Sequence, residues 1–128
     1  MQPTANITAS SRKRVLIAED NEDISIIFSY ALNQKFEVET ATNGREALDK
    51  IERDSPDLLV LDINMPFVSG IDVLNSLREH QSKHSMKIIV ATGNTIAATD
   101  PIMDYADMTL VKPVSPYQLA RLAERLLA

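Results

Sequence analysis

The sequence contains no cysteine, which excludes disulfide bonds, thiolate metal sites and redox chemistry at a thiol. Apolar stretches are also short, because charged residues interrupt each of them before it reaches the length that crosses a bilayer. We therefore expect a soluble protein without membrane contact. The lack of cysteine is compatible with a reducing compartment, so we expect a cytoplasmic protein.

The charge pattern of the sequence shows no evident surface for binding nucleic acid. There are 13 lysine and arginine residues against 18 aspartate and glutamate residues, giving a net charge of −5, and no basic stripe offsets it. Direct binding to nucleic acid is not expected.

The length of 128 residues fits one folded domain. Residues 1–12 are polar and lack the apolar run of a signal peptide, so we expect a flexible N-terminal tail there. The folded domain is expected to span residues 13–128.

The folded part is organised around residues 58–66, LLVLDINMP. Its run of four apolar residues is typical of a strand covered on both faces in a parallel sheet. Pro66 biases Met65 away from the helical region, so the chain leaves the sheet after Asp62 and exposes this carboxylate at the carboxyl end of the strand. Open α/β sheets bind their ligands at that end.

Four further strands are predicted by short apolar or alternating runs. The five predicted strands are residues 15–18, 36–41, 58–62, 87–92 and 108–111. Helical signals follow them, except that residues 95–104 are weakly patterned and broken by Pro101, so that any helix there should be short or distorted. Five strand–helix units predict an α/β fold with a doubly wound parallel sheet and helices on both faces.

Capping residues mark where the predicted helices begin. They are Asn21, either Thr42 or Asn43 with Glu46, and Ser115 followed by Pro116. The first of these helices is expected to turn one apolar face inward, formed by Ile24, Ile27, Phe28 and Ala31.

Polar groups of different kinds end four of the five strands. They are Glu19 with Asp20, Asp62, Thr92 and Lys112. The carboxyl ends of parallel strands share one edge, so these side chains should meet in one crevice. Three carboxylates that close repel one another, and Mg²⁺ with its preference for oxygen ligands is the expected compensation. Asp62 could then attack phosphorus and form an acyl phosphate, with Lys112 and Thr92 complementing the charge of the phosphoryl group.

These motifs, in this order, resemble the receiver domain of two-component response regulators, the CheY-like superfamily. The matching residues are Glu19-Asp20, Asp62-Ile63-Asn64-Met65-Pro66 with Gly70, Thr92, and Lys112-Pro113. The resemblance implies a flavodoxin-like sheet of order 2-1-3-4-5. It further implies a signalling switch rather than an enzyme acting on outside substrates, with only self-catalysed phosphoryl transfer and autodephosphorylation.

The resemblance also implies a role for each site residue. Asp62 would accept phosphate from a histidine kinase or a histidine phosphotransfer protein. Asp20 and Asp62 would bind Mg²⁺ directly, Asn64 through its backbone carbonyl and Glu19 through water. Thr92 and Lys112 would bind the phosphoryl oxygens. Movement of Thr92 would alter contacts with a downstream protein partner or an output domain. Phosphorylation could also promote formation of a dimer.

The chain departs from the family pattern at the switch. Thr109 stands where the family usually carries an aromatic residue three positions before the lysine, and Tyr105 is a candidate substitute. Pro101 and the short fourth crossover fall where the output surface of the family lies. Asn94 could influence how a hydrolytic water enters.

Other functions fit the sequence less well. A phosphatase with an aspartate nucleophile needs a second acid two residues later, where this chain has Asn64. A flavin-binding module shares the fold, but with only three glycines and an acidic crevice no phosphate cradle is apparent. A receiver-like interaction domain that takes no phosphate is a third alternative, which the departure at Thr109 leaves open.

Two further features carry expectations. His80 and His84 lie four residues apart in a polar run without a third ligand, so we expect solvated histidines rather than a metal site. The sequence ends just after the last predicted helix and contains no output domain, so we expect either a single-domain regulator or a receiver cut from a larger regulator or hybrid kinase.

Overall fold

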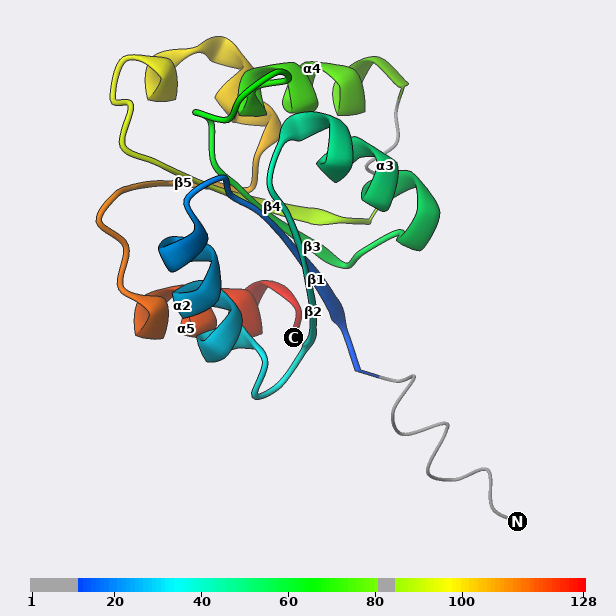
Figure 1. The fold of residues 1–128 in the computed structure, drawn as a ribbon, viewed down its shortest axis with the longest axis vertical. Helices are drawn as coiled ribbons and strands as arrows, with labels where there is room; N and C mark the ends of the chain where they lie inside the picture. Colours follow the sequence, from blue (N-terminus) through cyan, green and yellow to red (C-terminus); the bar gives the residue numbers. More distant parts are fainter. Residues whose placement is uncertain (1–11, 81–84) are drawn as a thin grey trace.

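The computed structural model describes residues 12–80 and 85–128 and contains one parallel sheet of five strands (Figure 1). The strands stand in the order β2-β1-β3-β4-β5, which confirms the predicted fold class and strand order. Their bounds are β1 Arg14–Ala18, β2 Glu37–Ala41, β3 Leu58–Leu61, β4 Lys87–Thr92 and β5 Met108–Val111.

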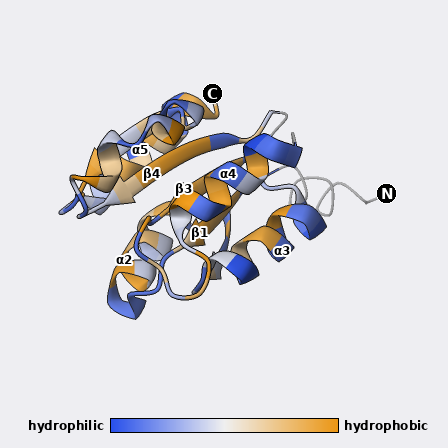
Figure 2. Cartoon of the chain, turned by 90° about the horizontal axis from the view of Figure 1, so that it is seen from above, coloured by the Kyte–Doolittle hydropathy of each residue, from blue (hydrophilic) through white to orange (hydrophobic). Residues whose placement is uncertain are grey.

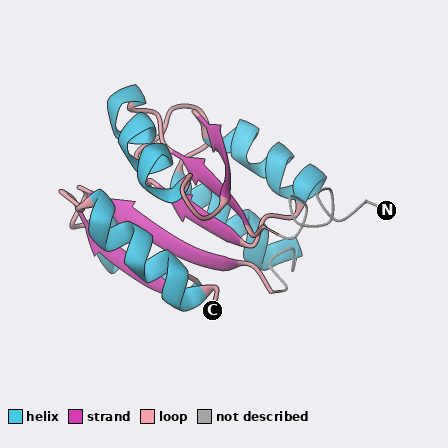
Figure 3. Cartoon of the chain, turned by 90° about the horizontal axis from the view of Figure 1, so that it is seen from below, coloured by secondary structure: helices cyan, strands magenta, loops and turns pink. Residues whose placement is uncertain are grey.

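Helices cover both faces of the sheet (Figures 1 and 3). One face carries α2 (Glu22–Leu32) and α5 (Pro116–Leu126), which pack against each other. The other face carries α3 (Gly44–Asp54), α4 (Gly70–His80) and two short 3₁₀ helices, η1 (Ala97–Thr99) and η2 (Pro101–Tyr105). Within residues 12–80 and 85–128, every helix is too short or too polar to cross a bilayer.

The central strands are buried on both faces, as the continuous apolar run of β3 predicts. Leu59 and Leu61 point into the core under α3 and α4, whereas Leu58 and Val60 point into the core under α2 and α5. The strands therefore form the most apolar part of the molecule (Figure 2). Burying each of these side chains stabilises the fold by about 1.5–3 kcal/mol, which makes this sheet a rigid support for its own edge.

Local signals fixed where the helices begin. The Asn21 side chain accepts a hydrogen bond from the Ile24 N–H at 3.0 Å, and Asn43 accepts one from the Glu46 N–H at 2.8 Å. Ser115 caps α5 in the same way. The Glu46 carboxylate returns to the N–H of Thr42 at 2.8 Å, so both alternatives for this helix start take part in one cap.

The structure corrects the predicted inner face of α2 and agrees with the prediction for residues 95–104. Ile27 was expected to face inward, but its side chain is 49% exposed; the buried residues of α2 are Phe28 and Leu32, so the covered face is narrower than the periodicity predicted. Residues 95–104 hold only the 3₁₀ helices η1 and η2, because Pro101 interrupts the segment, as expected.

Some expectations fall largely outside the described residues. Residues 1–11 of the predicted tail and His84 lie there, so the structure tests neither the tail nor a pairing of the two histidines. His80 is exposed at the end of α4, and its Nδ1 lies 2.8 Å from the carbonyl oxygen of Ser76.

Gly70 stands where α4 passes closest to β3. A Cβ at this position would overlap the carbonyl oxygen of Asp62, whereas a Cβ at Gly93 would meet nothing within 4 Å. Packing therefore requires a glycine at position 70 but not at position 93.

Replacing Gly70 with alanine should push α4 away from Asp62 and lower the free energy of unfolding by about 1–3 kcal/mol. Gly93→Ala is the matched control, and it should leave stability unchanged or raise it by up to about 1 kcal/mol, because its backbone lies outside the left-handed region. Urea unfolding monitored by circular dichroism measures both. Equal effects of the two substitutions would contradict the close approach at Gly70.

Candidate functional site

The backbone continues the sheet for one residue past the ends of the central strands. The Asp62 N–H donates to the carbonyl oxygen of Ala18 at 2.9 Å, and the Glu19 N–H donates to that of Ala41 at 2.9 Å. Glu19 and Asp62 are thereby held side by side at the carboxyl edge, while Asp20 follows at the start of the loop. Pairing of β1 with β3 thus brings together Glu19 and Asp62, which lie more than forty positions apart in the sequence.

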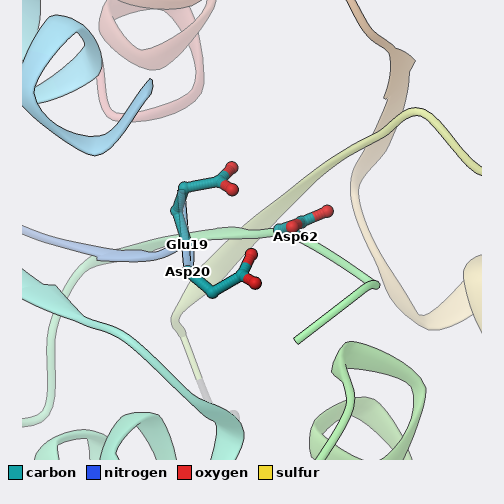
Figure 4. Close-up of side chains that lie close together, drawn as sticks. All are labelled: Glu19, Asp20 and Asp62. Atoms are coloured by element: carbon teal, nitrogen blue, oxygen red, sulfur yellow. The ribbon is translucent and has the colours of Figure 1, made fainter. Parts of the chain in front are cut away.

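The three acids form one cluster (Figure 4). Oxygen atoms of Glu19, Asp20 and Asp62 all lie within 4.8 Å of one another. Glu19 is 3% exposed and Asp62 is 5% exposed, whereas Asp20 is open to solvent. A set of carboxylate oxygens that is partly buried and partly open fits a hard divalent cation such as Mg²⁺, which keeps several waters.

Lys112 enters the same site from the end of β5. Its N–H donates to the carbonyl oxygen of Thr92 at 2.9 Å, which fixes its backbone beside β4. Its ammonium nitrogen lies 2.7 Å from Oε1 of Glu19 and 3.6 Å from Oδ1 of Asp62. The closer partner of Lys112 is therefore Glu19, and its ammonium lies against two of the three carboxylates.

The electrostatic consequence appears at Asp62. Burial, followed by the negative charge of Glu19, raises the pKa of the Asp62 carboxyl to about 7, although Lys112 and the N–H of Asn64 act in the opposite direction. At neutral pH, nearby positive charge does not fully compensate the negative charge of the Asp62 carboxylate. A proton, a cation or a transferred group with cationic partners would relieve it.

Thr92 ends β4, and Asn64 lies in the loop that follows Asp62. Thr92 is fully buried at the end of β4, and its hydroxyl oxygen accepts a hydrogen bond from the Asn94 N–H at 3.0 Å. The Asn64 N–H lies 3.4 Å from Oδ1 of Asp62, and its side-chain oxygen accepts from the Asn94 amide at 3.4 Å. All the predicted site residues thus lie at the carboxyl edge of the sheet, Thr92 as the last residue of β4 and the others just beyond the strand ends.

Thr109 and Tyr105, the residues at which the switch departs from the family, lie in different places. Thr109 is partly buried on β5, opposite Val90 of β4. Tyr105 packs against the core under α4, and its hydroxyl donates to the carbonyl oxygen of Leu77 at 3.3 Å. Tyr105 therefore joins η2 to α4, a contact that the sequence did not predict.

An apolar groove beside Lys112 was also not predicted. It has a volume of about 400 Å³ and lies between α2 and the segment that leads into α5. Its lining residues are Ile24, Ile27, Phe28, Lys112, Pro113, Val114 and Pro116. Sequence periodicity assigned Ile24 and Ile27 to the core, and only their partial exposure reveals the groove.

Comparison with known sequences identifies the family. The sequence model of the response regulator receiver domain matches residues 15–124. The alkaline phosphatase synthesis transcriptional regulatory protein PhoP of Bacillus subtilis is 32% identical over 108 residues, which cover 84% of this chain and 45% of that protein. The transcriptional regulatory protein PrrA of Mycobacterium leprae is 34% identical, with coverage of 94% and 51%. The chain spans about half the length of the curated relatives it matches.

Solved structures of response regulators share the fold of this chain. The chemotaxis response regulator CheY4 of Vibrio cholerae superposes with a TM-score of 0.80 at 30% identity, covering 91% of this chain and 100% of that one. The response regulator TrrA of Thermotoga maritima, solved in complex with Mg²⁺ and BeF, gives a TM-score of 0.80 at 34% identity, covering 90% and 99%. Because the family sequence model spans most of the chain and the fold and acidic cluster agree with it, this chain belongs to the response regulator receiver domain family of two-component signal transduction.

Proposed function

We propose that this chain is the phosphoacceptor of a histidine–aspartate phosphorelay and that Asp62 receives the phosphoryl group. The donor is a phosphohistidine on a histidine kinase or a histidine phosphotransfer protein. The observation that carries the proposal is the acidic cluster of Glu19, Asp20 and Asp62 with the ammonium of Lys112 against Glu19 and Asp62. A structural salt bridge would need one carboxylate, whereas this site gathers three.

The transfer makes and breaks one bond at phosphorus. A carboxylate oxygen of Asp62 attacks, the bond from phosphorus to the donor imidazole breaks, and the imidazole leaves with the electron pair and takes a proton from solvent. Asp20, Asp62 and the Asn64 carbonyl would hold Mg²⁺, with Glu19 acting on it less directly, and the ion would supply positive charge to neutralise the phosphoryl oxygens.

Two side chains compensate the remaining negative charge of the phosphoryl group. Lys112 moves from Glu19 to a phosphoryl oxygen, a short path because its ammonium already lies 3.6 Å from Asp62. The Thr92 hydroxyl donates a hydrogen bond to another phosphoryl oxygen. Asn64 stands where a phosphatase would carry its second acid, so the acyl phosphate persists long enough to change the contacts of the domain.

The output of this chain is a change in protein contacts. Its curated relatives include transcriptional regulators about twice its length, so the target is either an output domain of the same polypeptide or a separate protein. The alternative of an interaction domain that takes no phosphate is tested by the same labelling experiment.

Incubation with Mg²⁺ and acetyl phosphate should add the mass of one phosphoryl group to the wild-type chain, as measured by intact mass spectrometry. Asp62→Asn should abolish the addition, because the amide has no nucleophilic oxygen. Asp49→Asn is the matched control: it removes an exposed aspartate from α3 and should label as the wild type does. Equal labelling of Asp62→Asn and wild type would refute the assignment of Asp62.

The raised pKa of Asp62 makes stability depend on pH in a defined direction. Its folded value of about 7 lies above the ordinary 3.8, so the favourable contribution of the protonated carboxyl is complete below about pH 4 and is lost as the pH rises through 7. In EDTA at pH 8, Asp62→Asn should therefore be more stable than the wild type by about 1–3 kcal/mol, and this gain should shrink at pH 5. Urea unfolding at a series of pH values measures it.

Mg²⁺ provides the complementary test in the same assay. It should stabilise the wild type at pH 8 and stabilise Asp62→Asn much less, since the variant has lost one ligand charge. A gain from Asp62→Asn that is the same at pH 5 and pH 8 would contradict the electrostatic account.

We further propose that the apolar groove beside Lys112 receives the protein phosphodonor, which must cover this edge to reach Asp62. Ile27→Asp would put a charge into the groove. It should slow transfer from a phosphotransfer protein that labels the wild type by about tenfold, the usual loss at an important interface residue. Labelling by acetyl phosphate should be unchanged, because the small donor needs no docking. Slowing of both donors equally would show damage to the acceptor site instead.

A further inference from the structure

Asn94 connects three parts of the molecule that lie around Asp62. Its N–H donates to the Thr92 hydroxyl oxygen at 3.0 Å, and its side-chain amide donates to Oδ1 of Asn64 at 3.4 Å. Its side-chain oxygen accepts from the N–H of Ala97 at 2.9 Å, and its carbonyl oxygen accepts from that of Ala98 at 3.0 Å. One residue thus contacts the end of β4, the loop after β3 and the start of η1.

The contact with Thr92 opposes the role proposed for that hydroxyl. The Thr92 side chain is fully buried, and its oxygen is the acceptor for the N–H of Asn94. A rotation that carries the oxygen toward a phosphoryl group on Asp62 takes this acceptor away. A partly buried N–H without an acceptor is costly, so the backbone at Asn94 has to follow Thr92.

The segment beyond Asn94 is held weakly enough to change its conformation when Asn94 moves. Its first turn is held by the side-chain and carbonyl oxygens of Asn94, and η1 and η2 are short 3₁₀ turns whose hydrogen bonds are weaker than those of an α-helix. Ile102 and Met103 of η2 lie in the core, and Tyr105 bonds to Leu77 of α4. A displacement at Asn94 therefore reaches both the core and the end of α4.

We propose that Asn94 is the positioning residue that couples Thr92 to residues 95–106, so that phosphorylation of Asp62 reorganises η1 and η2. The inference rests on the proposed function and adds the route that the signal takes. Rotation of an aromatic ring on β5 is not available to this chain, because that position is Thr109. The cap formed by the Asn94 side chain takes its place.

The test follows backbone amides by ¹⁵N–¹H NMR while Mg²⁺ and beryllofluoride, a phosphoryl mimic, are added to the whole chain. In the wild type, the amides of Asn64, Ala97 and Ile102 should all shift. In Asn94→Ala the Asn64 amide should still shift, whereas the shifts at Ala97 and Ile102 should fall to less than half.

Asn94→Asp separates the two side-chain contacts of this residue. Aspartate keeps an oxygen acceptor for the Ala97 N–H but has no amide to donate to Asn64, so it should restore the response at Ala97 and Ile102. Thr95→Ala, at the exposed neighbouring position, is the control and should respond as the wild type does.

Full responses at Ala97 and Ile102 in Asn94→Ala would overturn the inference, and so would an Asn94→Asp variant that behaves like Asn94→Ala. Failure of the proposed function looks different. In that case the wild-type amides next to Asp62 would not shift with Mg²⁺ and beryllofluoride, and the inference would fall with it.

Discussion

The structure depends on the crowding of negative charge at one edge of a rigid sheet. Glu19 and Asp62 are buried beside each other because β1 and β3 are paired neighbours. Lys112 compensates part of this charge, and it lies closer to Glu19 than to Asp62. Burial and the charge of Glu19 therefore raise the pKa of the Asp62 carboxyl to about 7, which suits this group to bind a cation and accept a phosphoryl group.

The same arrangement places a weakly held segment beside the acidic cluster. The sheet and the helices α2, α3, α4 and α5 are held by extensive apolar burial, whereas residues 95–106 contain only short 3₁₀ turns anchored by a few side chains. A change of charge at Asp62 therefore acts between a rigid sheet and the weakly held residues 95–106. The response is then expected where the local stability is lowest.

The sequence predicted the fold and the meeting of the three acids with Lys112, because the strands and the residues at their ends are set by local patterns. The uninterrupted apolar run of Leu58–Leu61 determined the central strand, and the parallel topology brings together whatever follows the strand ends. Asn21, Asn43 and Ser115 begin their helices as their side-chain chemistry predicts. The family resemblance supplied the individual roles, which geometry alone does not give.

Other features could not be predicted, for physical reasons. Helical periodicity assigned Ile27 to the inner face, but the width of that face depends on how far α5 and the segment before it extend across α2. The contact of Asn94 with Asn64 joins residues 30 positions apart through two loops whose shapes no local signal specifies. The preference of Lys112 for Glu19 is a choice between side-chain positions, and it depends on the balance of charges in the assembled site.

The central claim is that the carboxylate of Asp62, and no other group, takes the phosphoryl group. Reduction of the acetyl phosphate-treated protein with borohydride converts an aspartyl phosphate to homoserine, and peptide mass spectrometry then locates the converted residue. We expect homoserine at position 62 alone, and only when Mg²⁺ was present during labelling. Homoserine at another aspartate, or none in a protein that carries the phosphoryl mass, would contradict the account.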